Sequence, residues 1–363
     1  MKQVLSENRK KLISLGILAV LLILLILLRG QKALMSVIYG ATLWLRQGLG
    51  ALLSYVPFSV MELLIAAAVV GVIVFLVLAG VHIVRAKGRR IQVLFRRLLC
   101  ALNAVAALLL ALWVLHGAGF YGESFADKSG ITPVSADAGT LYRVTVRFAD
   151  ALSQAADEVA RDDTGAFAVS KKEIFAQVHG LYDGICTLYP FLEAPETNPK
   201  KLVSSRMLSA FGYTGIYFPF TGEANINVDA PACLMPATIA HELAHQRGVV
   251  SEQEANFVAI LACLESGNAV YRYSGLLSGY IHLSNALYQA DRELFSDAWS
   301  HLSDAVRRDI DNNNAYWAQF ESPVTEVGER VYDTFLKSYG QELGIRSYGA
   351  VVDMLVAYYA DGL

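Results

Sequence analysis

Long apolar runs dominate the first third of this 363-residue chain. Three of them, at about residues 12–28, 60–84 and 98–120, are each close to the roughly 20 residues that a helix needs to cross a bilayer. We therefore expect three transmembrane helices. A further apolar run at 34–53 is interrupted by Arg46, so we expect an interfacial or re-entrant helix there rather than a fourth span.

From residue 121 onward the pattern changes to that of a separate cored domain, for which about 240 residues are ample. Apolar residues at helical spacing predict helices over 137–161 and 170–189. Residues 213–228 contain two short apolar stretches around a turn, which predicts a β-hairpin. The predicted fold is a mainly α membrane protein, with three transmembrane helices followed by a mostly helical α+β domain that carries a short hairpin.

Charge is distributed unevenly between these two parts. Residues 1–120 hold 13 Lys and Arg but 2 Asp and Glu, whereas residues 121–363 hold 17 and 31. The basic residues cluster at the N-terminus and between the second and third predicted spans, and the positive-inside rule places both regions in the cytoplasm. The first span ends at Arg29 without a small-residue cleavage pattern, which favours an anchor over a signal peptide. Three crossings then leave the domain 121–363 outside the cytoplasmic membrane.

Other sequence patterns narrow the classes of partner. The four cysteines form no CxxC pair and do not predict a disulfide framework. No P-loop, glycine-rich dinucleotide turn or basic patch with interleaved aromatic residues occurs, so we expect no nucleic-acid partner.

The segment 241–245, which reads HELAH, carries the strongest chemical signal. Two histidines four residues apart project from the same face of an α-helix, where both imidazoles can reach one metal ion. Glu242 then lies beside the coordination position left for water, where it can accept a proton. His241 and His245 are thus predicted zinc ligands and Glu242 the predicted general base. The alternative is a surface helix that carries two histidines by chance.

A zinc site of this kind needs a third protein ligand. Glu252 and Glu254 both follow the histidines, and on a helix they point to nearly opposite sides, so at most one should face the metal. We predict Glu254, because Glu-Ala-Asn followed by an apolar run resembles the third-ligand segment of several compact zinc peptidases. The alternative is that Glu254 forms a capping box with Ser251 and binds no metal.

The predicted hairpin offers an edge to which an extended peptide could add through main-chain hydrogen bonds. Glu223, Asn225 and Asn227 are possible substrate-binding residues there; the alternative is a hairpin that only covers the core. An oxyanion-stabilising donor is left unassigned among five side chains, which are Tyr271, Tyr273, Tyr280, His282 and Tyr288.

Five stretches together carry a family resemblance: 219–227, 241–248, 252–257, 331–337 and 344–352. In this order they resemble the bacterial membrane proteins of domain of unknown function 3810, a zincin-like family without an assigned substrate. The resemblance implies a zincin-like extracytoplasmic domain. It also implies site roles at matching positions, with metal ligands at His241, His245 and Glu254 and the base at Glu242.

The leading hypothesis is a membrane-anchored zinc metalloendopeptidase that holds one zinc ion. It would hydrolyse peptide bonds through a water activated by zinc, with Glu242 as general base. Its partners would be the lipid bilayer and a peptide or protein substrate of the cell envelope. The alternative is a non-catalytic, metal-stabilised envelope sensor or peptide-binding scaffold. Intramembrane proteolysis ranks last, because His241 lies far from the apolar runs in the sequence.

Overall fold

The computed structural model describes residues 2–338 and 348–359, most of which are helical. Residues 344–347 of the C-terminal stretch 344–352 lie outside this described part. The chain divides into two compact units. The first unit contains residues 1–42 and 60–123, and the second contains residues 43–59 and 124–363. Helix α3 (Lys32–Leu53) contributes to both units, because the division falls within it.

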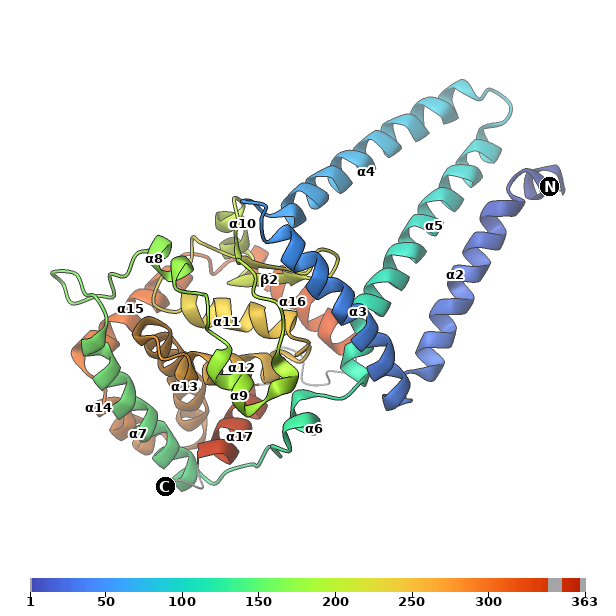
Figure 1. Cartoon of the computed structure of the whole chain (residues 1–363). Helices are drawn as coiled ribbons and strands as arrows, with labels where there is room; N and C mark the ends of the chain where they lie inside the picture. Colours follow the sequence, from blue (N-terminus) through green and yellow to red (C-terminus); the bar gives the residue numbers. More distant parts are fainter. Residues whose placement is uncertain (1, 339–347, 360–363) are drawn as a thin grey trace. The chain divides into compact units, whose positions relative to one another are not determined.

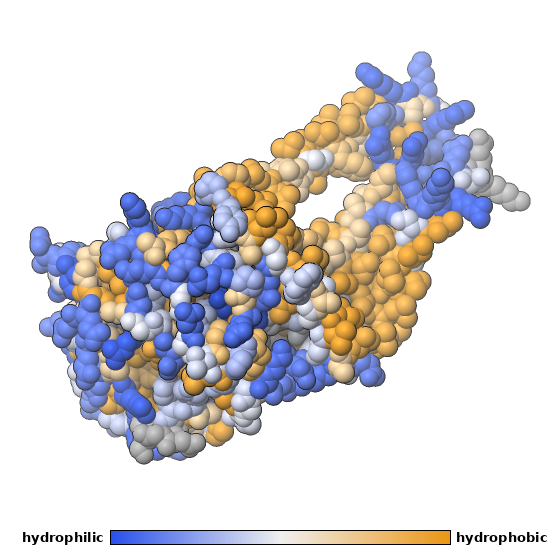
Figure 2. Space-filling model, in the orientation of Figure 1, coloured by the Kyte–Doolittle hydropathy of each residue, from blue (hydrophilic) through white to orange (hydrophobic). Residues whose placement is uncertain are grey.

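The first unit contains three helices that are long and apolar enough to cross a membrane. They are α2 (Arg9–Leu28), α4 (Val60–Arg85) and α5 (Arg90–Leu115), and apolar side chains cover their surfaces (Figure 2). Each of the three predicted apolar runs coincides with one of them. The third run, predicted at 98–120, lies too far toward the C-terminus. Helix α5 begins at Arg90 and ends at Leu115, and a 3-10 turn, η1 (Gly117–Tyr121), follows it. A short helix, α1 (Lys2–Glu7), precedes α2.

The second unit combines many helices with one small sheet. Its helices are α6 (Phe125–Ser129), α7 (Ala138–Ala155), α8 (Lys171–Ala176), α9 (Asp183–Leu188), α10 (Ser205–Ala210), α11 (Met235–Gln246), α12 (Glu252–Glu265), α13 (Ala269–Ala290), α14 (Arg292–Ser300), α15 (Asp304–Ala318), α16 (Pro323–Ser338) and α17 (Tyr348–Tyr359). Its 3-10 turns are η2 (Ala156–Glu158) and η3 (Pro190–Leu192). Its strands are β1 (Lys200–Lys201), β2 (Gly215–Phe218) and β3 (Glu223–Ile226).

The core of this unit forms where α7, α11, α12, α13 and α17 pack together. Helix α11 lies between the sheet on one side and helices α12 and α13 on the other (Figure 1). Two glycines of α13 permit the tight packing. A Cβ at Gly279 would lie 2.4 Å from the ring of Phe148 on α7, and a Cβ at Gly275 would lie 2.5 Å from Cβ of Cys263 on α12. The helices therefore approach at distances that only glycine allows.

The sheet has the strand order β1-β3-β2. The predicted hairpin is present: β2 pairs antiparallel with β3, with Gly215 opposite Ile226 and Phe218 opposite Glu223. Strand β1 adds to the far side of β3 in parallel orientation, and its two residues give too short a pattern to be found in the sequence. Strand β2 is thus an edge strand, and it packs on α11.

The helix predicted over 137–161 is present as α7, extended by η2, and Asp137 caps it by accepting a hydrogen bond from the Thr140 backbone N–H. The single helix predicted over 170–189 was wrong. The structure has two short helices there, α8 and α9, because the chain turns at Gly180, whose φ of 75° is incompatible with a continuing helix.

Candidate metal centre

Helix α11 carries the three residues of the HELAH segment that were expected to act on a metal. Pro236 occupies its first turn, where a missing backbone N–H costs nothing. The helix ends at Gln246, and Gly248 with a φ of 93° turns the chain back. Glu242 and His245 are buried, and the helix as a whole is an interior element rather than a surface one.

His241, His245 and Glu252 form a compact cluster of possible metal ligands. The two histidine Nε2 atoms are 3.1 Å apart. Oε2 of Glu252 lies 3.1 Å from Nε2 of His241, and its Oε1 lies 3.4 Å from Nε2 of His245. In the parts of the chain that the structure describes, this is the one such group found. The cluster reaches the surface through Glu252, whose side chain is 27% exposed.

The structure brings Glu252, rather than the predicted Glu254, to the two histidines. The carboxylate of Glu254 faces away and accepts hydrogen bonds from the backbone N–H groups of Phe125 (3.0 Å) and Ala126 (2.9 Å) at the start of α6. The alternative of a capping box also fails, because Ser251 precedes α12 without a side-chain cap hydrogen bond. Glu254 does satisfy a helix N-terminus, but that helix is α6 and not its own.

The ring of His245 is held in one orientation by the backbone. Its Nδ1 lies 2.7 Å from the carbonyl oxygen of Val249. Since a carbonyl oxygen can only accept, Nδ1 carries a proton, and in the neutral ring Nε2 keeps its lone pair toward the cluster. The turn at Gly248 brings this carbonyl into reach. The turn that follows α11 therefore also orients the ring of the candidate ligand His245.

Glu242 lies against the edge strand β2. A Cβ at Gly215 would fall 2.5 Å from Oε1 of Glu242, so the glycine makes room for the carboxylate. Burial raises the pKa of Glu242, while the neighbouring His241 and His245 and a hydrogen bond from the Tyr217 backbone act in the opposite direction. The outcome is a carboxyl group that binds a proton more readily than an exposed one.

The opposite charges of the histidines and Glu252 determine the direction of their pKa shifts. Burial alone would lower the pKa of His245, but the carboxylates of Glu252 and Glu242 outweigh it and raise that pKa to about 9. Burial would raise the pKa of Glu252, yet His245 and His241 hold it well below its usual range. Glu252 is thus an anion across the neutral pH range, as a carboxylate ligand must be.

Comparison with known proteins places the chain in a family. The model of the family described as "Protein of unknown function (DUF3810)" matches residues 39–356, which is most of the sequence. The chain belongs to this family. No curated protein and no solved structure matches it. The match includes α11, α12 and the sheet, so the cluster lies within the part that defines this DUF3810 protein.

Two residues near the cluster were not found from the sequence. The ring of Tyr217 on β2 lies beside His245, with ring centroids 6.2 Å apart. The hydroxyl of Tyr217 accepts a hydrogen bond from Nη1 of Arg46 at 3.1 Å. Arg46 is 1% exposed although it comes from helix α3. A lone arginine in an otherwise apolar run was the available signal, because a charge in such a run usually has a buried partner.

The three predicted substrate-binding residues lie inside the second unit. Glu223, Asn225 and Asn227 are each at most 2% exposed. Glu223 accepts a hydrogen bond from Thr221 at 2.8 Å, and the side-chain amide of Asn227 donates to the carbonyl oxygen of Tyr213 at 2.8 Å. The structure therefore uses these side chains to fix the hairpin and its turn, and the outer edge of the hairpin is the backbone of β2.

The five candidate oxyanion donors differ in their hydrogen-bond partners and in their burial. The hydroxyls of Tyr271 and Tyr273 donate to Ile174 O and to Asp309, respectively, and Tyr288 is exposed. Tyr280 is buried in the core. The pKa of the remaining candidate, His282, is lowered to about 4 by burial and by the charge of His241. His282 is thus neutral near pH 7.

Proposed function

We propose that this protein is a membrane-anchored, zinc-dependent metallopeptidase whose catalytic unit lies outside the cytoplasmic membrane. Helices α2, α4 and α5 would anchor it, and their basic flanks favour a cytoplasmic N-terminus. One observation carries the proposal: three donor atoms of zinc-ligand type converge beside a buried glutamate.

The donor set fits zinc. Nitrogen and oxygen ligands at about 2.0–2.1 Å from a tetrahedral zinc ion are about 3.3 Å from one another. Nε2 of His241 lies 3.1 Å from Nε2 of His245 and 3.1 Å from Oε2 of Glu252, and Nε2 of His245 lies 3.4 Å from the other carboxylate oxygen of Glu252, Oε1. Three protein ligands also leave one position open, which is the arrangement of catalytic rather than structural zinc sites. When bound, zinc would polarise the scissile carbonyl and make water more acidic.

Glu242 would act as the proton acceptor. Its carboxylate would take a proton from the attacking water as the new C–O bond forms, and would give that proton to the amine nitrogen as the C–N bond breaks. A raised pKa suits this double role, because the group must both bind and release the proton near neutral pH. His282, which is neutral near pH 7 because its pKa is lowered to about 4, could donate a hydrogen bond to the developing oxyanion.

Strand β2 would bind the substrate backbone. The backbone N–H of Asn227 donates to Thr214 O at 2.9 Å, and paired backbone groups alternate along an antiparallel ladder. Gly215 and Tyr217 therefore direct their backbone groups away from β3, toward Glu242, and an extended peptide that takes over the hydrogen bond between the Tyr217 backbone and Glu242 could pair with this edge. This supports peptides, rather than small esters or amides, as the substrate class.

A small pocket lies between the end of the hairpin and helices α11 and α15, and it could receive a substrate side chain. Its lining includes Thr214, which precedes Gly215, and Thr238, which lies one helical turn before Glu242. Trp317 of α15 closes another side.

The test compares wild type and Glu242→Gln as purified full-length proteins supplied with zinc. Each is incubated with a mixed peptide library, and new termini are identified by mass spectrometry. We expect zinc to stay bound to Glu242→Gln while cleavage falls by about 10²–10⁴-fold, the usual contribution of a general base. Glu293→Gln, an exposed glutamate on α14, is the matched control and should cleave as wild type does. Wild-type cleavage by Glu242→Gln would refute the mechanism, and zinc binding without any cleavage by wild type would favour a scaffold.

A further inference from the structure

The segment 43–59 is part of the unit that holds the candidate metal centre, although in sequence it lies among the membrane helices. Side chains join it to that unit at both of its ends. Nε2 of Gln47 donates to Gln246 O at 3.1 Å, and Oγ of Ser59 donates to Oδ1 of Asn225 at 2.6 Å. Nζ of Lys200 donates to Leu53 O at 2.8 Å. These hydrogen bonds therefore attach the segment to the rest of this unit.

The backbone of the segment touches the turn between β2 and β3. A Cβ at Gly50 would lie 2.6 Å from the carbonyl oxygen of Gly222, and a Cβ at Gly222 would lie 2.2 Å from that of Arg46. Glycine at both places allows this approach. Helix α3 and the turn of the hairpin are thus in direct contact.

The polarity of the segment is inverted relative to a surface helix in water. Its one charged residue, Arg46, is 1% exposed and faces Tyr217. The outward side carries Trp44 (77% exposed), Leu45, Leu52 and Tyr55 (89% exposed). Leu45 and Leu52 are seven residues apart on one face of α3, and Tyr55 lies in the turn that follows the end of the helix at Leu53. Arg46 thus points into the protein, and a stripe of apolar side chains along the helix and the turn after it points outward.

An apolar stripe of this length facing water is unfavourable, and it indicates a surface that something covers. The chain itself indicates the occupant. The segment ends at Ser59, and α4, with a mean hydropathy of 3.0 over its candidate membrane span, begins at the next residue. Trp and Tyr are the side chains enriched where a protein meets the headgroup region of a bilayer. The stripe contains no charged residue that would repel lipid chains or mark a rim for a protein partner.

We propose that the stripe formed by Trp44, Leu45, Leu52, Tyr55 and Phe58 lies in the boundary between lipid headgroups and acyl chains. Helix α3 then has a lipid side and a protein side, and the protein side carries Arg46 to the hydroxyl of Tyr217 beside His245. The bilayer thereby becomes one support of the candidate metal centre and holds it at the membrane surface.

The first test measures tryptophan quenching by brominated lipid. The full-length protein with Trp44 as its sole tryptophan (Trp113→Phe, Trp299→Phe, Trp317→Phe) is reconstituted into phosphatidylcholine vesicles, with or without bromine near the carbonyl end of the acyl chains. We expect bromine to quench Trp44. A matched protein that keeps only Trp299, on α14, should be unaffected. Equal emission of Trp44 in both lipids would overturn the proposal.

A second measurement keeps the proposal testable if those substitutions unfold the protein. A nitroxide on Tyr55→Cys should collide more often with oxygen, which partitions into lipid, than with a water-soluble nickel chelate. The same label on Asn314→Cys, an exposed position of α15, should show the opposite order. A preference for nickel at residue 55 would place the stripe in water. Low accessibility to both reagents would place it under another protein. Either result contradicts the proposal, and neither depends on zinc or on peptide cleavage.

Discussion

At the scale of single residues, the candidate centre depends on charge and on the space left by glycine. His241 and His245 each contact Glu252, and the carboxylate keeps His245 protonated up to about pH 9 when no metal is bound. A zinc ion would have to displace that proton, so zinc binding should strengthen as the pH rises toward this value. The Glu252 carboxylate, which raises the pKa of His245, would itself bind the zinc ion once His245 has lost this proton.

Gly215→Ala tests the position of Glu242 without changing any charge. The new Cβ would lie 2.5 Å from Oε1 of Glu242, so the carboxylate has to move. We expect zinc content to stay at the wild-type level and kcat/KM for a cleaved library peptide to fall by about 10²-fold, the typical effect of misplacing a catalytic group by about 1 Å. Gly48→Ala, a helical glycine with open space around it, should leave both quantities unchanged. Undiminished cleavage by Gly215→Ala would show that Glu242 is not the base.

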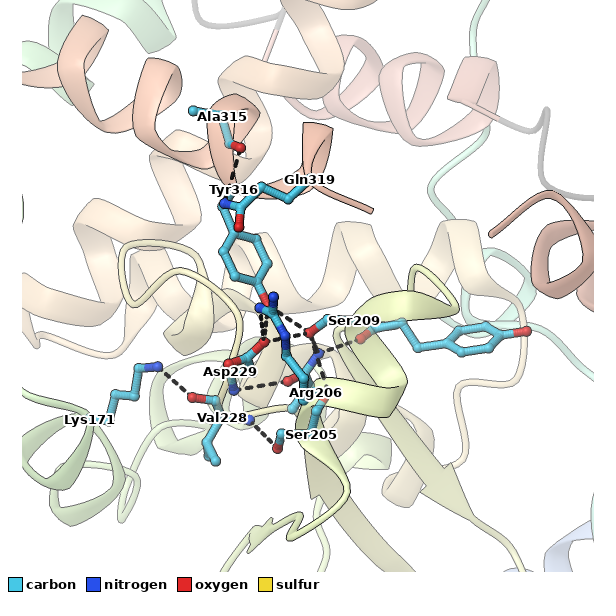
Figure 3. A network of polar contacts seen from close by, with 11 residues as sticks. Lys171, Ser205, Arg206, Ser209, Val228, Asp229, Ala315, Tyr316 and Gln319 are labelled. Atoms are coloured by element: carbon cyan, nitrogen blue, oxygen red, sulfur yellow. Dashed lines mark hydrogen bonds and ion pairs between the residues drawn. The ribbon is translucent and has the colours of Figure 1, made fainter. Parts of the chain in front are cut away.

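At the scale of elements, a polar network ties helix α15 to the sheet region. Asp229 accepts hydrogen bonds from the Tyr316 hydroxyl at 2.6 Å and from Ser209 at 3.2 Å, and it pairs with Arg206 at 3.1 Å (Figure 3). Ser209 in turn accepts a hydrogen bond from Asn227 at 2.9 Å. The network therefore holds the end of the hairpin where Asn227 follows β3.

This network predicts a pH-dependent contribution to stability. The Tyr316 hydroxyl, with Arg206 and Ser209, lowers the pKa of Asp229 from 3.8. Because the folded-state pKa is depressed, the stabilisation is complete above the unfolded value and is lost as the pH falls through the lower folded value. Asp229→Asn should lower the free energy of unfolding by about 1–2 kcal/mol at neutral pH, allowing for the partial exposure of the group. Thermal unfolding should show this deficit shrinking below pH 3.8; a deficit that is independent of pH would contradict the assignment.

Elements set by local pattern could be predicted, and those set by long-range packing could not. The HELAH helix and the hairpin follow from the spacing of apolar residues and from turn residues close in sequence. The choice between Glu252 and Glu254 depends on how far α12 is rotated relative to α11, which is fixed by the turn at Gly248 and by α6 binding Glu254. Likewise, the inward direction of Arg46 depends on Tyr217, which is distant in sequence.

At the scale of the whole molecule, the proposed topology places the basic region and the acidic region of the chain on opposite sides of the membrane. The loop between α4 and α5 is strongly basic, whereas residues 121–363 are acidic. In intact cells, an impermeant maleimide should label Asn314→Cys on α15 and should label Arg89→Cys only after permeabilisation. Wild type, with its four native cysteines, sets the background. The reverse labelling pattern would place the metal centre in the cytoplasm.

Zinc content per chain tests the central claim most directly. The full-length protein is purified as wild type, Glu252→Ala and Glu254→Ala, and bound zinc is measured by elemental mass spectrometry, with circular dichroism to verify folding. We predict near-stoichiometric zinc in wild type and Glu254→Ala and its loss in Glu252→Ala, because Glu252 alone of the two contacts His241 and His245. Zinc retained in Glu252→Ala, or no zinc in the wild-type protein, would contradict the account.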